Sequence, residues 1–195
     1  MKKLIQISFI VNLLVIIMIE FSCDAPLNSK TLVYDAVKHG CEWSVTLPES
    51  RPSDFNLLFK YGYGTINSRN ILNTFNATYT QDMEKDPPIT MDFSLSDEDM
   101  DRIYQKMVEI DFFCYPDEFV IPVPEDELVS GFDPYQGYFF RVECDHRIKV
   151  LQWEDNRLNK NEDADKLREL IQRIRNIIES KDEYWDLPQP RGIIL

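Results

Sequence analysis

The chain has 195 residues and a formal charge of −13 at pH 7, from 34 acidic and 21 basic residues. A field of that sign repels phosphate backbones, which argues against nucleic acid as a partner. Hydrophobic residues make up 44% of the chain and aromatic residues 12%, so a globular body is expected rather than a disordered one. The length suits one domain with a substantial core.

The first residues have the layout of a secretory signal. Lys2 and Lys3 form a positive start, and the stretch Leu4–Ile19 that follows is predominantly apolar. This stretch is slightly shorter than the run of about 20 apolar residues that spans a bilayer comfortably. A cleaved signal peptide is therefore the prediction, and a retained signal-anchor helix is the alternative.

The end of this segment resembles a bacterial lipoprotein precursor, because Ser22-Cys23 follows the apolar core directly. In that family the peptide is cut just before a cysteine that carries lipid. The resemblance covers these 23 residues and implies a signal peptide over residues 1–22 and lipid attachment at Cys23. The polar residues that follow predict a tether over residues 23–30, and the length predicts a single domain over residues 31–195. The resemblance also implies export and anchoring to the membrane of the cell envelope through the N-terminal lipid. Glu20 departs from the pattern, since such precursors usually carry a leucine-like residue there.

Four segments in the first half of the body alternate between apolar and polar residues with a period of two. They are separated by turn residues, mainly proline and glycine. The segments are Cys41–Leu47, Phe55–Tyr61, Ile71–Thr80 and Ile89–Leu95. Consecutive strands of this kind, joined by short turns, predict an antiparallel meander.

Two segments have helical spacing instead. Ser96 followed by Asp99 is typical of a capping box and predicts a helix over Asp97–Asp111. Near the end of the chain, acidic residues precede and basic residues follow a continuous apolar stripe, as the helix dipole favours. The stripe consists of Leu167, Leu170, Ile171, Ile174, Ile177 and Ile178. We expect this helix to lie across one face of the sheet.

The remaining segments complete the prediction. Phe119–Val123 is expected as a short edge strand, and Tyr138–Cys144 with Ile148–Trp153 as a hairpin. The fold class is therefore α+β, an antiparallel sheet of about six strands with two amphipathic helices packed on one face. In its alternating strands, its Tyr61–Gly64 turn and its late Leu-Pro-Gln-Pro tail, the body is similar to small exported bacterial domains that lack an assigned function.

Chemical motifs are sparse. The two histidines, His39 and His146, stand outside any G-x-S-x-G, H-E-x-x-H, P-loop or G-x-G-x-x-G motif. No catalytic residue, cofactor or metal ligand is assigned. His39 and Cys41 with Cys144 and His146 could supply a zinc site as an alternative. The stretch Asn159–Asp165 superficially resembles a calcium loop but lacks the required glycine and glutamate, so it is expected to be a helix N-terminus.

If Cys23 carries lipid, three of the four cysteines remain, and an exported compartment permits one disulfide among them. Cys41 and Cys144 both fall on the apolar side of expected strands. We expect any disulfide to join Cys41 and Cys144, and Cys114 to be a buried free thiol.

Two function classes stay open. The first is a lipid-anchored binding or interaction module of the envelope with a protein partner, whose candidate surfaces are the loops Gly62–Asn70 and Pro124–Gln136. The alternative is a hydrolase-like envelope enzyme with a dispersed carboxylate and histidine site. A deep pocket that gathers a histidine with acids would favour the enzyme. A closed core with a flat or loop-rimmed face would favour the module.

Overall fold

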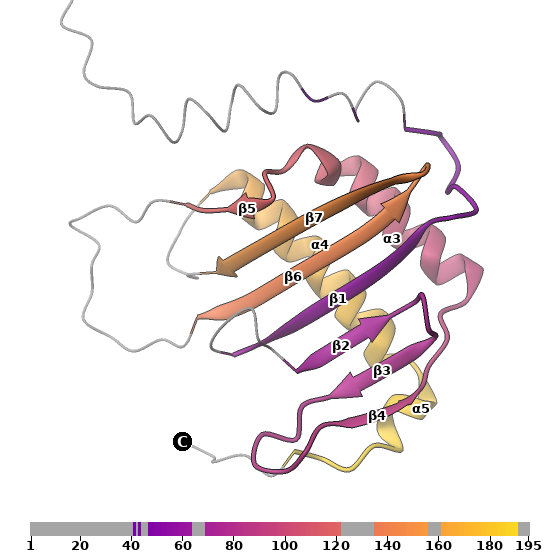
Figure 1. Ribbon diagram of the computed structural model, residues 1–195, viewed down its shortest axis with the longest axis vertical. Helices are drawn as coiled ribbons and strands as arrows, with labels where there is room; N and C mark the ends of the chain where they lie inside the picture. Colours follow the sequence, from indigo (N-terminus) through magenta and orange to yellow (C-terminus); the bar gives the residue numbers. More distant parts are fainter. Residues whose placement is uncertain are drawn as a thin grey trace, which may run out of the picture. The chain divides into compact units, whose positions relative to one another are not determined.

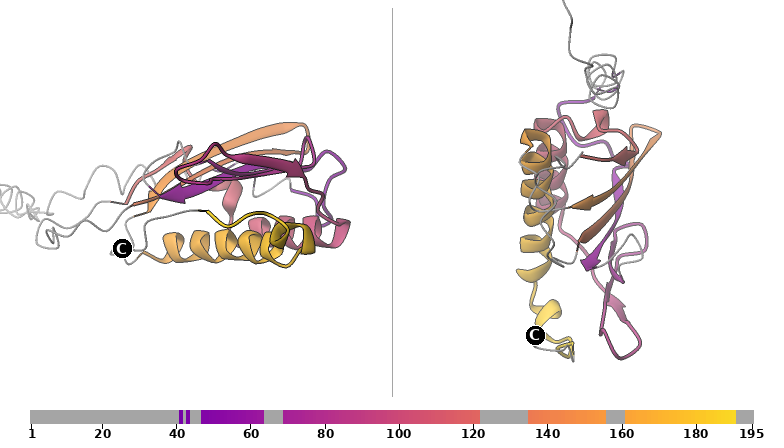
Figure 2. Two further views of the ribbon diagram at one scale, coloured as in Figure 1. Left: turned by 90° about the horizontal axis from the view of Figure 1, so that it is seen from below. Right: turned by 90° about the vertical axis from the view of Figure 1, so that its left-hand side faces the viewer.

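The computed structural model describes residues 41, 43, 47–63, 69–121, 135–155 and 161–190. In this part of the chain a seven-stranded sheet has the order β4-β3-β2-β1-β6-β7-β5, and two long helices cover one of its faces (Figures 1 and 2). The fold is α+β, as expected. The sheet has one strand more than expected and is mixed, because the edge strand β5 runs parallel to β7.

Along the described chain, four strands are followed by two helices, then by three strands and two further helices. The strands are β1 (Asn56–Tyr63), β2 (Asn70–Asn73), β3 (Thr78–Gln81), β4 (Ile89–Asp92), β5 (Glu118–Phe119), β6 (Gln136–Cys144) and β7 (Arg147–Asp155). The helices are α3 (Asp97–Glu109), the 3-10 helix η1 (Phe112–Cys114), α4 (Glu162–Glu179) and the short α5 (Asp182–Trp185).

The segment expected as one long strand, Ile71–Thr80, is instead β2 and β3 joined by a turn. The Oδ1 atom of Asn73 accepts a hydrogen bond of 3.1 Å from the backbone N–H of Phe75, and Ala77 has a φ of 50°. An Asx side chain that binds the backbone two residues ahead competes with strand pairing and reverses the chain. The prediction was wrong because the alternation of side chains continues through the turn.

The segment expected as the first strand, Cys41–Leu47, is described only in part. Cys41, Trp43 and Leu47 lie outside strands, and the other positions are not among the described residues. The ring of Trp43 stacks on that of Phe113 with centroids 4.9 Å apart. Trp43 therefore packs against η1, and the guanidinium of Arg147, the first residue of β7, lies 3.8 Å from the centroid of its ring.

The expected hairpin is confirmed as β6 and β7. Its two turn residues, Asp145 and His146, have φ values of 51° and 61°, the left-handed conformation that tight two-residue hairpins require. The carboxylate of Asp54 accepts hydrogen bonds from the backbone N–H groups of Asp145 and His146, at 3.1 and 2.6 Å. These bonds, that of His146 first, lower the pKa of Asp54 and hold the turn against the start of β1.

The core lies between the sheet and the helices. A row of paired residues crosses the sheet through Tyr79, Leu72, Phe59, Phe140 and Leu151, and all of them are buried. The whole predicted stripe of α4 is buried on the other side of this layer. Burial of apolar surface between two layers is the main source of stability for such a fold.

Both long helices begin as their sequences predict. Ser96 and Asp99 form a reciprocal capping box at α3, and the side chain of Asn161 caps α4. Burial alone would raise the pKa of Asp99, but Lys181 and Ser96 donate hydrogen bonds to its carboxylate and lower that pKa. Asp99 thus ties the start of α3 to the residues that follow α4. Among the described residues, no helix is long and apolar enough to cross a membrane.

Candidate functional site

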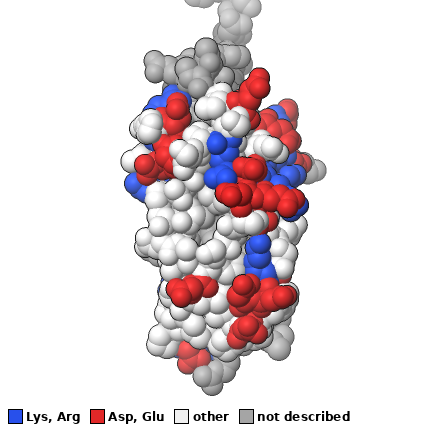
Figure 3. Space-filling view, turned by 90° about the vertical axis from the view of Figure 1, so that its right-hand side faces the viewer, with Lys and Arg blue, Asp and Glu red and all other residues white. Residues whose placement is uncertain are grey.

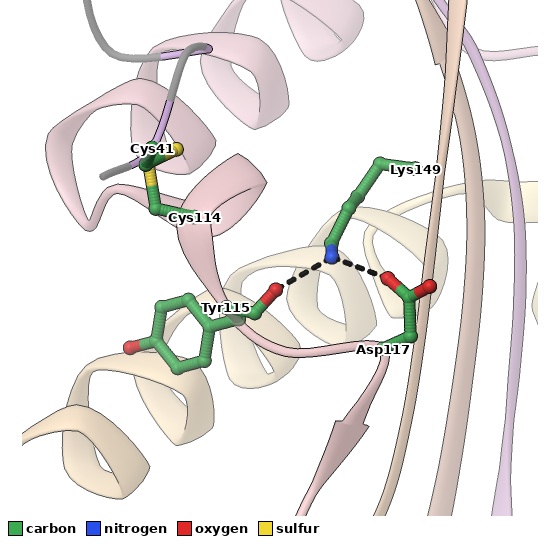
Figure 4. The surroundings of a disulfide bond; sticks show 5 residues. All are labelled: Cys41, Cys114, Tyr115, Asp117 and Lys149. Atoms are coloured by element: carbon green, nitrogen blue, oxygen red, sulfur yellow. Dashed lines mark hydrogen bonds and ion pairs between the residues drawn. A yellow bond between two sulfur atoms is a disulfide. The ribbon is translucent and has the colours of Figure 1, made fainter. Parts of the chain in front are cut away.

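A disulfide joins Cys41 to Cys114, with Cα atoms 5.5 Å apart (Figure 4). The expected Cys41–Cys144 pair is therefore wrong, and so is the expectation that Cys114 is a free thiol. Cys144 is the buried free cysteine of the described chain, and burial raises its pKa to about 11. The apolar pattern placed Cys144 inward correctly, whereas Cys41 is half-buried and lies outside any strand. The pattern carried no information about which segments are neighbours.

The segment after the disulfide is fixed to the sheet. The Nζ atom of Lys149, on β7, donates hydrogen bonds to the carbonyl oxygen of Tyr115 and, at 2.6 Å, to Oδ1 of Asp117 (Figure 4). Lys149 is itself buried, so this ion pair is a structural contact between β7 and the start of β5.

The expected chemical residues do not converge. His146 is 92% exposed in the β6–β7 turn, with Nδ1 3.4 Å from Oδ2 of Asp54. The disulfide removes Cys41 from the alternative zinc set, and His39 is not among the described residues. Within the described ranges, no group of three or more His, Cys, Asp or Glu residues could hold a metal ion.

Two further expectations can be placed. The side chain of Asn161 accepts hydrogen bonds from Asp163 and Ala164, so the calcium-like stretch is the N-terminus of α4, as predicted. Lipid attachment at Cys23 falls outside the described residues.

The two loops predicted as binding surfaces lie mostly outside the described residues, which omit 64–68 and 122–134. The strand ends that flank them are nevertheless adjacent. Tyr61 pairs with Asn70 across β1 and β2, Tyr63 pairs with Gln136 across β1 and β6, and Gln136 pairs with Asp155. Both loops therefore leave the sheet from the same end.

The opposite end of the sheet, which contains the β6–β7 turn, carries interspersed acidic and basic side chains (Figure 3). Several of these charges form ion pairs with one another. Arg51, for example, forms ion pairs of 2.7 Å with Asp97 and 2.6 Å with Asp101 at the start of α3. Such exposed pairs contribute about 0–1 kcal/mol each and leave little charge available for a partner.

The sheet face opposite the helices has no described element packed on it (Figure 2). We call this surface the open sheet face. It is centred on half-buried side chains of β1, β2, β6 and β7, namely Leu58, Lys60, Ile71, Phe139, Arg141 and Val150. An antiparallel sheet commonly has one face packed on the core and the other in contact with solvent, so a partner can reach these side chains.

Two cations stand at the centre of the open sheet face. Nζ of Lys60 lies 5.5 Å from the ring centroid of Phe139, and the guanidinium of Arg141 lies 4.9 Å from that of Phe75. Neither cation forms an ion pair with any carboxylate of the described chain, whereas Arg51, at the other end of the sheet, forms two. Unpaired cations among aromatic and aliphatic groups favour a partner that presents carboxylates.

A cavity of about 320 Å³ lies on the other side of the sheet, beside α4. It is lined by Tyr138, Asp155, Arg168, Ile171, Gln172 and Arg175. Asp155 is only 3% exposed, and Arg168 holds its carboxylate with two hydrogen bonds, Nε to Oδ2 at 3.0 Å and NH2 to Oδ1 at 2.6 Å. This bidentate pair neutralises one wall of the cavity.

Tyrosines stand next to the other arginine of the cavity. The guanidinium of Arg175 lies 5.4 Å from the ring centroid of Tyr61, whose hydroxyl is 2.7 Å from that of Tyr79. Burial raises the pKa of Tyr61 to about 12 and raises that of Tyr79 further, so both phenols stay protonated at neutral pH.

Neither the cavity nor the cationic centre of the open sheet face was predicted from the sequence. In the sequence, the three arginines cannot be distinguished, because each is a basic residue on a strand or on the polar side of a helix; they are Arg141, Arg168 and Arg175. Whether a guanidinium is neutralised or free to bind a ligand depends on the carboxylates that lie next to it in the folded chain. No match is found when the chain is compared with protein-family models, with curated proteins and with solved structures.

Proposed function

We propose that this protein is a lipid-anchored binding module of the bacterial cell envelope, which holds a protein partner on the open sheet face. The observation that supports this most directly is the pair of unpaired cations, Lys60 and Arg141, among the apolar side chains of that face. The enzyme alternative has less support, because His146 is exposed in a turn and the carboxylate beside it, that of Asp54, accepts hydrogen bonds from the backbone of the same turn.

Export is supported by two independent features. The first is the N-terminal segment, with its apolar stretch and the Ser22-Cys23 sequence at its end. The second is the Cys41–Cys114 disulfide, since disulfides persist in oxidising compartments and are rare in the cytosol. Attachment to the membrane then requires a lipid at Cys23, because the acidic chain has no electrostatic attraction to anionic lipid.

Replacing Cys23 with alanine should remove the anchor. In a bacterial host we expect the Cys23→Ala chain to appear in the soluble fraction or to accumulate unprocessed, while the unaltered chain stays with membranes. The measurement is fractionation followed by intact-mass analysis. Cys144→Ala is the matched control and should fractionate like the unaltered chain. A mature form that starts elsewhere, or an unmodified Cys23, would contradict the anchor.

Binding by the open sheet face follows from charge and solvation. A partner that presents carboxylates would pair with Lys60 and Arg141 without competition from acids of this chain, since neither cation has such a partner in the described part. The flanking side chains of Leu58, Ile71 and Val150 would then lose contact with water, which favours the complex. Pairing of charges in addition gives specificity and a faster association rate.

A photo-crosslinking amino acid at Leu58 should yield a discrete adduct in the native envelope. Reversing both central charges, with Lys60→Glu and Arg141→Glu, should reduce the adduct at least about tenfold, which corresponds to about 1.4 kcal/mol. Gel electrophoresis with detection of the chain measures the adduct, and circular dichroism verifies that the variant is folded.

The matched control reverses two other cations that form no described ion pair, through Lys85→Glu and Arg173→Glu. This variant has the same change in net charge but lies away from the open sheet face, so the adduct should persist. An adduct that survives the Lys60 and Arg141 reversals, or that is lost equally in the control, would contradict the assignment of this face.

A further inference from the structure

The cavity beside α4 contains a guanidinium with a buried, unsatisfied donor. Within the described part of the chain, the Nε atom of Arg175 is buried and has no hydrogen-bond partner, and Arg175 forms one ion pair, with Glu179, at 3.5 Å from NH2 to Oε1. An arginine carries five N–H donors, and buried donors without acceptors are costly and rare in folded proteins. The side chain is one-third exposed, at 33%, so a ligand can reach part of the guanidinium.

The contrast with Arg168, seven residues earlier on the same helix, is informative. Arg168 lines the same cavity, but its Nε and NH2 bind Asp155 and its NH1 binds Asp165 at 2.6 Å. Its donors are therefore committed to the protein. Arg175 is instead held in position by the ring of Tyr61 and by one long contact to Glu179. A guanidinium that is held in position while some of its N–H donors lack acceptors is pre-organised to bind an anion.

The cavity also limits the kind of anion. Its volume of about 320 Å³ lies at the lower end of the roughly 300–1,000 Å³ found for small-molecule sites. Arg168 is neutralised by its two short hydrogen bonds to Asp155, whereas the described carboxylate paired with Arg175 is that of Glu179, at 3.5 Å, so Arg175 is the less strongly paired cation of the lining. Glu179 beside it disfavours a ligand of higher charge. Ile171 and the ring of Tyr138 offer an apolar wall. A planar carboxylate matches the fork of donors on a guanidinium.

We propose that the cavity beside α4 binds a small monocarboxylate, whose carboxylate group pairs with Arg175 and whose apolar part lies against Ile171 and Tyr138. The site is on the helix-covered side of the sheet, so it is independent of the open sheet face. Success or failure of either proposal therefore leaves the other unaffected.

The test uses the full chain in detergent and benzoate as the probe. The Nε–Hε resonance of Arg175 should shift saturably as benzoate is added, and the δ-methyl resonance of Ile171 should shift in parallel. Benzamide, which has the same shape without the charge, and inorganic phosphate, which carries more charge, should produce neither shift. Arg175→Gln should weaken benzoate binding at least about tenfold, as read from the Ile171 methyl.

Arg173→Gln is the matched control, because Arg173 is two residues away on α4 and does not line this cavity. It should bind benzoate as the unaltered chain does. If Arg175→Gln does not fold, the benzoate titration followed at the Arg175 resonance of the unaltered chain still tests the proposal. The variant Arg175→Lys provides a second test. The proposal is overturned if benzoate causes no saturable shift at millimolar concentration, if benzamide or phosphate binds equally well, or if Arg173→Gln loses binding to the same extent.

Discussion

Replacing both Cys41 and Cys114 with serine should lower the free energy of unfolding by about 4 kcal/mol. The two cysteines are 73 residues apart in the sequence, and a cross-link that closes a loop of this length removes much of the conformational entropy of the unfolded chain. Urea denaturation of the oxidised chain and the double variant measures the difference. The same loss should follow when the unaltered chain is treated with a reducing agent.

Two comparisons make this prediction specific. The double variant should be insensitive to the reducing agent, because it has no disulfide left to break. Cys144→Ala leaves the disulfide intact and should keep the full response to reduction, since Cys144 is a free thiol. If reduction destabilised the double variant as much as the unaltered chain, a different pair of cysteines would have to be responsible.

Truncating Ile174 to alanine should cost about 2–5 kcal/mol of unfolding free energy. Ile174 is fully buried, at 0% exposure, in the middle of the α4 stripe that packs on the sheet. Removing its side-chain atoms loses apolar burial and leaves a cavity that the two layers cannot close completely. The midpoint of urea denaturation should fall with little change in slope.

The neighbouring residue provides the control. Arg173 precedes Ile174 directly but is exposed, so Arg173→Ala should change stability by no more than about 0.5 kcal/mol. Equal effects of the two substitutions, or an unchanged midpoint for Ile174→Ala, would mean that α4 does not pack on the sheet through this stripe.

The elements that could be predicted are those whose signal is local. The stripe from Leu167 to Ile178, the capping box of Ser96 with Asp99 and the Asp145–His146 hairpin each depend on side chains within a few positions of one another. Helix periodicity, capping and two-residue turns act over that range, so the sequence by itself determines them. The α+β class follows, because one apolar helix face and one apolar sheet face must cover each other.

Tertiary structure decided what depends on neighbours distant in the sequence. Alternation could not distinguish one strand from the pair β2 and β3, since the Asn73 turn keeps the period of two. It placed Cys144 inward but could not show that Cys41 meets Cys114. Arg168 and Arg175 lie on one helix, but Asp155 of β7 approaches only Arg168 and neutralises its guanidinium. Arg175 keeps one long contact, to Glu179, and so can bind a ligand. Electrostatic pairing depends on distances that only the packed chain defines, so the candidate sites emerged only from the tertiary structure.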